Sequence, residues 1–136
     1  VYMFTRSSVD GTFTQQSKLH ARDAAANDYF GTSVSLYGDT ALIGAHTDDY
    51  NGKTNSGSVY VFTRSSTNGG MFTQKSKLHV SDAVASHHNF GYSVSLYGDM
   101  ALIGATGDDD NSKSGSGSVY VFKAPPPPPP SPPPSL

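Results

Sequence analysis

The sequence contains no cysteine and no tryptophan among its 136 residues, which excludes disulfide bonds and thiolate metal sites. Charged residues make up 15% of the chain, against roughly 25% in ordinary globular domains, and the net charge is -2. Such a chain lacks the basic surface that nucleic-acid binding needs, so we expect no nucleic-acid partner. No apolar run approaches the about 20 residues of a transmembrane helix, so we expect no membrane span.

Proline is absent from residues 1–123, and long stretches of this part repeat. Residues 30–45 read FGTSVSLYGDTALIGA, and residues 90–105 read FGYSVSLYGDMALIGA. Two more repeated pairs flank them: SGSVYVF at 56–62 and 116–122, and FTQQSKLH or FTQKSKLH at 13–20 and 72–79. The near-constant spacing indicates one structural unit that occurs twice.

Each repeat has room for four strands. Residues 58–63 alternate valine with aromatic residues, which is typical of a β-strand. Residues 92–97 alternate Val94 and Leu96, which are expected inward, with Ser93, Ser95 and Tyr97 outward. Residues 71–80 are more polar and suit an outer strand. Residues 100–105 form a continuous apolar run that fits a strand buried on both faces, and Gly98-Asp99 before it predicts a tight hairpin.

These patterns predict an all-β fold for residues 1–123. We expect two tandem four-stranded antiparallel units, over about 7–63 and 64–123. Residues 1–6 match the strand that ends each repeat, so they are interpreted as an extra N-terminal strand left from a preceding repeat. Residues 124–136 form a separate tail.

The repeat resembles the FG-GAP family, whose repeats form blades of β-propellers. The matching pairs are Phe30-Gly31, Phe90-Gly91, Gly44-Ala45 and Gly104-Ala105. His46 and Thr106 stand where the family name has proline, and the closer match is a short variant common in secreted proteins. The resemblance implies propeller-type blades and an extracellular location. Propellers close with about four to eight blades, so two blades predict an open arrangement and not a closed single-chain propeller.

Calcium is the metal that this resemblance raises. Integrin-type repeats carry an Asp-rich loop between the FG and GAP strands, but here that connection is only Gly-Asp-Thr or Gly-Asp-Met. Acidic loops occur elsewhere, at Asp48 and Asp49 and at Asp108, Asp109 and Asp110. Their spacing does not match a calcium loop, and Asp and Asn also favour ordinary turns. We therefore favour no metal site and no cofactor, with calcium at these five residues as the alternative.

Catalytic motifs are missing from the sequence. The segment Gly52-Lys53-Thr54 resembles the end of a P-loop, but the earlier glycine is absent and no helix is expected to follow. His20 and His79 occupy the same repeat position, which favours a structural role in the blade. His87-His88 is assigned to a loop. We predict that the protein is not an enzyme.

The tail contains all nine prolines, at positions 125–130 and 132–134. Proline lacks the backbone N–H and fixes φ, so the run predicts a polyproline II helix. Three interpretations stay open: a stiff linker, a ligand for SH3-like or profilin-like modules, and a glycosylated tail. The last rests on a resemblance to hydroxyproline-rich glycoproteins of plant and green-algal walls. It implies hydroxylation and O-glycans at Pro125, Pro126, Pro127, Pro128, Pro129, Pro130, Pro132, Pro133 and Pro134.

Taken together, these features predict an extracellular, non-enzymatic structural protein, a subunit of a glycosylated surface filament or of a cell-wall or matrix assembly. Its expected partners are copies of itself in a head-to-tail array, because two blades leave open edges. The candidate assembly strand consists of Val1, Tyr2, Met3 and Phe4. The alternative is a fragment of a larger adhesion or ligand-binding propeller.

Overall fold

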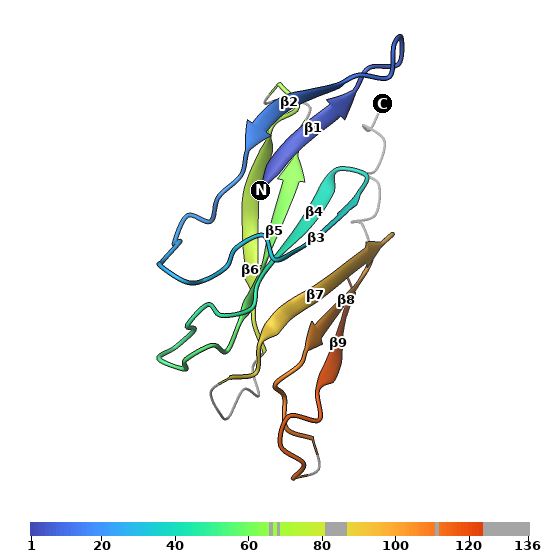
Figure 1. Cartoon of the computed structure of the whole chain (residues 1–136). Coiled ribbons are helices and arrows are strands. Elements are labelled where there is room, and N and C mark those ends of the chain that lie inside the picture. Colours follow the sequence, from blue (N-terminus) through green and yellow to red (C-terminus); the bar gives the residue numbers. More distant parts are fainter. Residues whose placement is uncertain (66, 68, 81–86, 111, 124–136) are drawn as a thin grey trace, which may run out of the picture.

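Figure 1 shows the computed structural model of the chain. The structure describes residues 1–65, 67, 69–80, 87–110 and 112–123. The tail predicted to form polyproline II, residues 124–136, lies outside the described residues.

Nine strands make up the described fold, and every strand pair is antiparallel. The strands are β1 (Tyr2–Arg6), β2 (Phe13–Lys18), β3 (Ser33–Tyr37), β4 (Thr40–Ala45), β5 (Ser58–Arg64), β6 (Phe72–Leu78), β7 (Phe90–Tyr97), β8 (Met100–Ala105) and β9 (Ser118–Lys123). They form three sheets in the orders β1-β2, β3-β4-β5-β6 and β7-β8-β9. The predicted fold class is therefore confirmed: the protein is all-β, with open propeller-type blades and no closed barrel among the described strands.

Sheet boundaries do not fall where the sequence periods begin. The polar strand β2 pairs with β1, and its counterpart β6 pairs with β5 at the edge of the central sheet. The predicted periods, 7–63 and 64–123, each contribute strands to two sheets. By repeat position, β1-β2 contains the last two strands of a blade, β3–β6 is a whole blade, and β7–β9 contains the first three strands.

The central sheet packs face to face on β7–β9. Strand β7 crosses β3 and β4, and Figure 1 shows the two sheets stacked along the long axis of the molecule. Leu42 and Val59 from the central sheet meet Phe90 and Ile103 from the next sheet, and all four are buried. Burial of this apolar surface is the main force that holds the two sheets together.

Backbone contact at this junction depends on two glycines. A Cβ built on Gly44 would collide with the carbonyl oxygen of Gly91, so β4 and β7 approach more closely here than side chains allow. Ser33 Oγ donates a hydrogen bond to the Gly91 carbonyl (2.7 Å), and Phe90 N–H donates to Ser56 O (3.1 Å). The Phe-Gly pair of one blade is thus held in a socket formed by the preceding blade.

The other face of the central sheet packs against the β1-β2 hairpin. We call the contact between the central sheet and β7–β9 the first junction, and this contact with the hairpin the second junction. At the second junction the central sheet buries the residues whose repeat equivalents on β8 and β9 face the first junction: Ala41, Ile43, Ala45, Tyr60 and Phe62. Val1 and Met3 cover this cluster in part. Among the described strands, this hairpin has two strands where the sheet at the first junction has three, so the second junction is a reduced version of the first one.

Candidate assembly site

The outer face of β7–β9 is an apolar surface that the described part of the fold leaves open. We call it the C-terminal face and define it by four residues at 47–65% exposure: Met100, Leu102, Val119 and Val121. The registers Leu102↔Val121 and Gly104↔Val119 place them side by side on neighbouring strands. Exposed apolar patches of this kind mark interaction surfaces.

Repeat symmetry indicates what this face is built to contact. Leu102 corresponds to Leu42 and Val119 corresponds to Val59, sixty residues earlier. Leu42 and Val59 are 2% and 0% exposed because β7–β9 covers them. The C-terminal face therefore has the residues of an inter-blade interface, but no described sheet lies on it.

An open hollow of about 410 Å³ lies at one edge of the C-terminal face. Its lining consists of Ser93, Gly104, Ala105, Thr106, Ser116, Gly117, Ser118 and Val119. The equivalent positions of the central sheet include Ser33, Gly44 and Ser56, which surround Phe90 and Gly91. The hollow is thus the second copy of the Phe-Gly socket.

The opposite end of the molecule is also apolar. Val34 and Leu36 on β3 are 57% and 58% exposed, whereas their repeat equivalents on β7 are partly buried against the central sheet. Tyr2 and Phe4 on β1 are exposed as well. Val34 and Leu36 define the N-terminal face, and Tyr2 and Phe4 lie on the outer side of the neighbouring hairpin.

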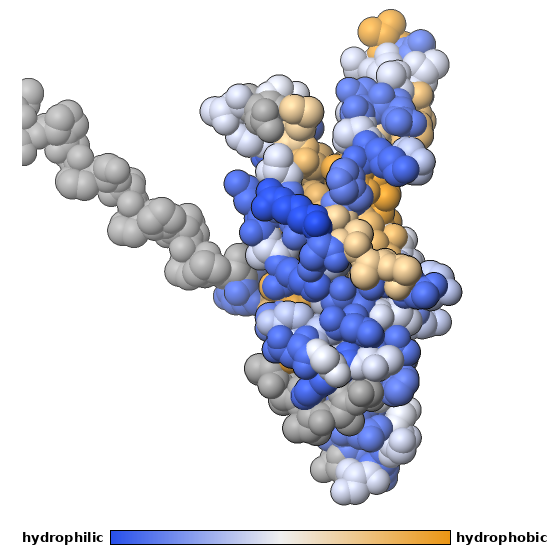
Figure 2. All heavy atoms as spheres, turned by 90° about the vertical axis from the view of Figure 1, so that its left-hand side faces the viewer, coloured by the Kyte–Doolittle hydropathy of each residue, from blue (hydrophilic) through white to orange (hydrophobic). Residues whose placement is uncertain are grey.

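Strand β1 contains the predicted assembly residues. Val1 and Met3 point toward the core of the central sheet, and Tyr2 and Phe4 point outward. A small cavity of about 90 Å³ separates the hairpin from the β5–β6 end, and Figure 2 shows apolar surface in the notch between these two lobes. Within the described residues, neither β1 nor β2 packs across β3 and β4 in the way that β7 does.

A polar cluster lies at the end of the central blade. Asp48 accepts a hydrogen bond from Ser58 Oγ (2.6 Å), and its carboxylate lies 2.9 Å from Lys77 Nζ. Lys77 also pairs with Asp23 (2.7 Å), which belongs to the segment between β2 and β3. The cluster therefore ties the outer strand β6 to the loops of its own blade.

Charge pairing in this cluster shifts the titration of its members. Burial alone would lower the pKa of Lys77, but hydrogen bonds with Asp23, Asp48 and Tyr60 outweigh it and raise the pKa above its usual range. Burial raises the pKa of Tyr60 well above its ordinary value. Lys77 therefore stays charged and Tyr60 stays neutral over the physiological range, as a structural cluster requires.

The last sheet contains a variant of this cluster. Tyr120 OH donates to Asp108 (2.9 Å), and His88 Nδ1 lies 2.9 Å from the other oxygen of the same carboxylate. Burial would raise the pKa of Asp108, but hydrogen bonds from Ser118 and Tyr120 and the charge of His88 lower it overall. His88 lies in a loop, as the sequence predicted, and in that loop it is buried next to Asp108.

The acidic residues considered for calcium are divided between two loops. Asp48 and Asp108 point inward and bind protein groups, while Asp49 and Asp109 accept backbone N–H groups of their own loops at 2.8 and 2.7 Å. Asp110 accompanies Lys113 in a short backbone bridge. Across the described ranges, no group of three or more His, Cys, Asp or Glu side chains is placed to hold a metal ion.

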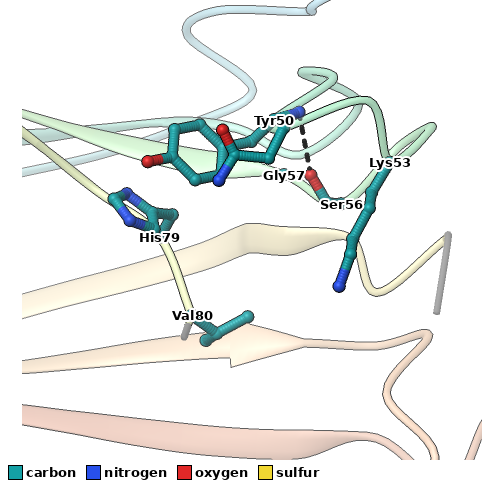
Figure 3. A pocket seen from close by; sticks show the side chains of 7 residues that line it. Tyr50, Lys53, Ser56, Gly57, His79 and Val80 are labelled. Atoms are coloured by element: carbon teal, nitrogen blue, oxygen red, sulfur yellow. Dashed lines mark hydrogen bonds between the residues drawn. The ribbon is translucent and has the colours of Figure 1, made fainter. Parts of the chain in front are cut away.

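A pocket of about 120 Å³ lies between the acidic loop of the central blade and the end of β6. Figure 3 shows its lining: Tyr50 stacks on His79 with ring centroids 3.8 Å apart, and Ser56 Oγ accepts a hydrogen bond from the Tyr50 N–H. Lys53 and Val80 complete the wall. His79 is packed against a neighbouring ring here, which is a structural contact.

The sheets and the junction between them define an open stack of propeller-type blades. A scan of protein families matches the FG-GAP repeat at residues 13–62 and 72–122, which is most of the chain. The protein belongs to the FG-GAP repeat family. A search of curated proteins returns no significant match.

The described residues contain no helix with the length and apolar character needed to cross a bilayer.

Proposed function

We propose that the protein is a non-enzymatic structural subunit whose incomplete blades are completed by neighbouring copies in a head-to-tail array. The C-terminal face carries this proposal, because its residues repeat those of an interface that is buried inside the same molecule. The N-terminal face, with β1 as the assembly strand, is the surface that a neighbour meets. Contacts between two different faces repeat without closing and build linear assemblies.

We further propose that the assembly is extracellular and glycosylated. FG-GAP repeats typically occur in extracellular domains, which supports this location. Sugars on the hydroxylated prolines between 125 and 134 would keep a weakly charged filament dispersed. Mass spectrometry of native material tests this: tail peptides should carry one extra oxygen per modified proline together with pentose or hexose. Unmodified tails would refute the glycan proposal.

Charge on the C-terminal face tests the assembly. Val119→Glu with Val121→Glu places two carboxylates on exposed positions of β9, so the isolated chain should fold normally. Buried carboxylates at a junction are costly, so sedimentation should show loss of multimers. Val9→Glu is the matched control, because Val9 is 94% exposed in the β1–β2 turn. Equal association of the two variants would contradict the proposal.

The alternative is that these residues are part of a larger adhesion or ligand-binding propeller. The same uncovered face favours it, since a following blade of the same polypeptide would cover Leu102 and Val119 equally well. The intact mass of the native protein distinguishes the two proposals. A polypeptide several hundred residues longer would favour the closed propeller.

A further inference from the structure

The two incomplete sheets complement each other. By repeat position, β7–β9 provides the first three strands of a blade, and β1-β2 provides the last two. The whole blade, β3–β6, defines four strand types by position. Among the described strands, the type of its third strand occurs three times, as β1, β5 and β9, and each other type occurs twice. Joining β7–β9 of one copy to β2 of another therefore makes a four-stranded blade, and β1 is left over.

We propose that β9 of one copy displaces β1 of a second copy and pairs with β2 of that second copy. The C-terminal face of the first copy then packs against the β3–β4 face of the second. This inference rests on the assembly proposed above and names its partner, a second copy, and its mechanism, strand exchange. In the free chain β1 fills a position that β9 of the neighbour occupies in the assembly.

Strand register makes the exchange possible. Tyr2 lies opposite Lys18 in the hairpin, as Tyr60 lies opposite Lys77 in the central sheet. The register shifts at the same place in both pairs, between the third and fourth residues of the Val-Tyr-x-Phe segment. Strand β9 has the same segment, Val119 to Phe122, so it fits the register that β1 holds.

Apolar burial favours the exchanged state. Strand β1 supplies only Val1 and Met3 to the second junction, and Val34 stays 57% exposed. The C-terminal face would instead supply the equivalents of Leu42 and Val59 from two adjacent strands. At the first junction these residues cover the β7 positions that correspond to Val34 and Leu36, so exchange buries surface that β1 leaves open.

The Phe-Gly socket fits the same arrangement. A Cβ built on Gly31 would lie 2.9 Å from Val1 Cγ2, and one built on Gly91 would lie 2.9 Å from Val59 Cγ2. The two glycines therefore meet equivalent valines, and Val119 of a neighbour can replace Val1. Exchange then places Phe30-Gly31 of the second copy in the open hollow of the first copy. Within one chain, Phe90-Gly91 lies in the equivalent socket of the central sheet.

Charge complementarity supports the pairing of β9 with β2. Lys18 lies over the ring of Tyr2 at 5.5 Å, as Lys77 lies over Tyr60 at 5.0 Å. Lys77 also reaches a buried Asp, and Asp108 is the equivalent carboxylate in the last sheet. A neighbour's Lys18 on β9 would lie over Tyr120 and next to Asp108, which repeats across two chains the contacts of Lys77 with Tyr60 and Asp48.

An engineered disulfide tests the exchange directly, because the chain has no natural cysteine. Val121 of one copy would lie opposite Ser17 of the next, as Val61 lies opposite Ser76. The variant with Ser17→Cys and Val121→Cys should therefore form covalent multimers on a non-reducing gel after mild oxidation. The control with Val9→Cys and Val121→Cys should stay monomeric, because Val9 lies in the turn between β1 and β2. Equal crosslinking of the two would overturn strand exchange.

Deletion of residues 1–6 separates strand exchange from simple stacking. Without β1, no chain has its β2 occupied by its own first strand. The protein concentration needed for assembly should therefore fall by roughly tenfold. If Tyr2 and Phe4 instead contact the neighbour directly, the deletion abolishes assembly, which overturns exchange and leaves the proposed function intact. If the full chain stays monomeric and the glutamate variants change nothing, the proposed function itself fails. Circular dichroism checks the fold of the deletion variant, and the cysteine pair tests exchange in the full chain.

Discussion

Residues at equivalent positions of the two repeats have different surroundings, so the same substitution is expected to have different effects on stability. Gly44 and Gly104 occupy the same position in successive blades. A Cβ on Gly44 would meet the backbone of Gly91, whereas a Cβ on Gly104 would meet mainly the movable side chain of Ser93. The difference arises only because a sheet covers one glycine and not the other.

Gly44→Ala is therefore expected to destabilise the fold by about 1–3 kcal/mol through overpacking against backbone. Gly104→Ala should change the free energy of unfolding of the monomer by less than about 0.5 kcal/mol. Urea unfolding of both variants measures the difference. Equal losses would show that β4 and β7 do not approach closely at Gly44.

Asp108 should make stability depend on pH in acid. Its pKa is lowered in the folded state, so its contribution is complete above its ordinary value of 3.8 and is lost as pH falls through the folded pKa. Asp108→Asn should lower the melting temperature at neutral pH, and the gap to the native chain should narrow below pH 3.8. Asp99→Asn, in the exposed β7–β8 turn, is the control. A gap that stays constant with pH would rule out this role.

At the scale of elements, identical strands differ in burial according to what lies beyond them. Strand β4 is covered on both sides, by β7–β9 and by the β1-β2 hairpin. Strand β8 has the same sequence apart from its first residue, but its outer side is open. The expectation that the run 100–105 is buried on both faces was therefore wrong for β8, although it describes its repeat copy β4.

Leu42→Ala and Leu102→Ala measure this asymmetry. Leu42 is fully enclosed between sheets, so its truncation should cost about 3 kcal/mol. Leu102 is 47% exposed, and its truncation should cost less than about 1 kcal/mol in the monomer. Thermal unfolding at low protein concentration makes the comparison, and similar costs would mean that the C-terminal face is already covered in the monomer.

For the whole molecule, folding is expected to be independent of calcium. Asp48 and Asp108, the most buried of the candidate ligands, are engaged by hydroxyl and cationic groups of the protein. Addition of a chelator should therefore leave the melting temperature unchanged. A fall on chelation that calcium reverses would show that the acidic loops bind the ion after all, because a ligand of the folded state stabilises it.

The sequence by itself determined the strands and their order. Alternation of valine with aromatic residues, the Gly-Asp turns and the repeat spacing are local signals, and each predicted strand type occurs in the structure. The polar strand 71–80 was expected at an outer position, and β6 lies at the sheet edge. The repeat also predicted that two blades would not close into a ring.

Only the tertiary structure decided which strands share a sheet and which faces are covered. Strand β2 could follow β1 or precede β3 in a sheet, and the polar pattern of residues 13–20 fits either choice. The pairing of His88 with Asp108 has no counterpart in the first repeat, so the repeat contained no signal for it. Burial depends on what packs against a surface, and identical repeats cannot encode the difference between a sheet inside the stack and one at its end.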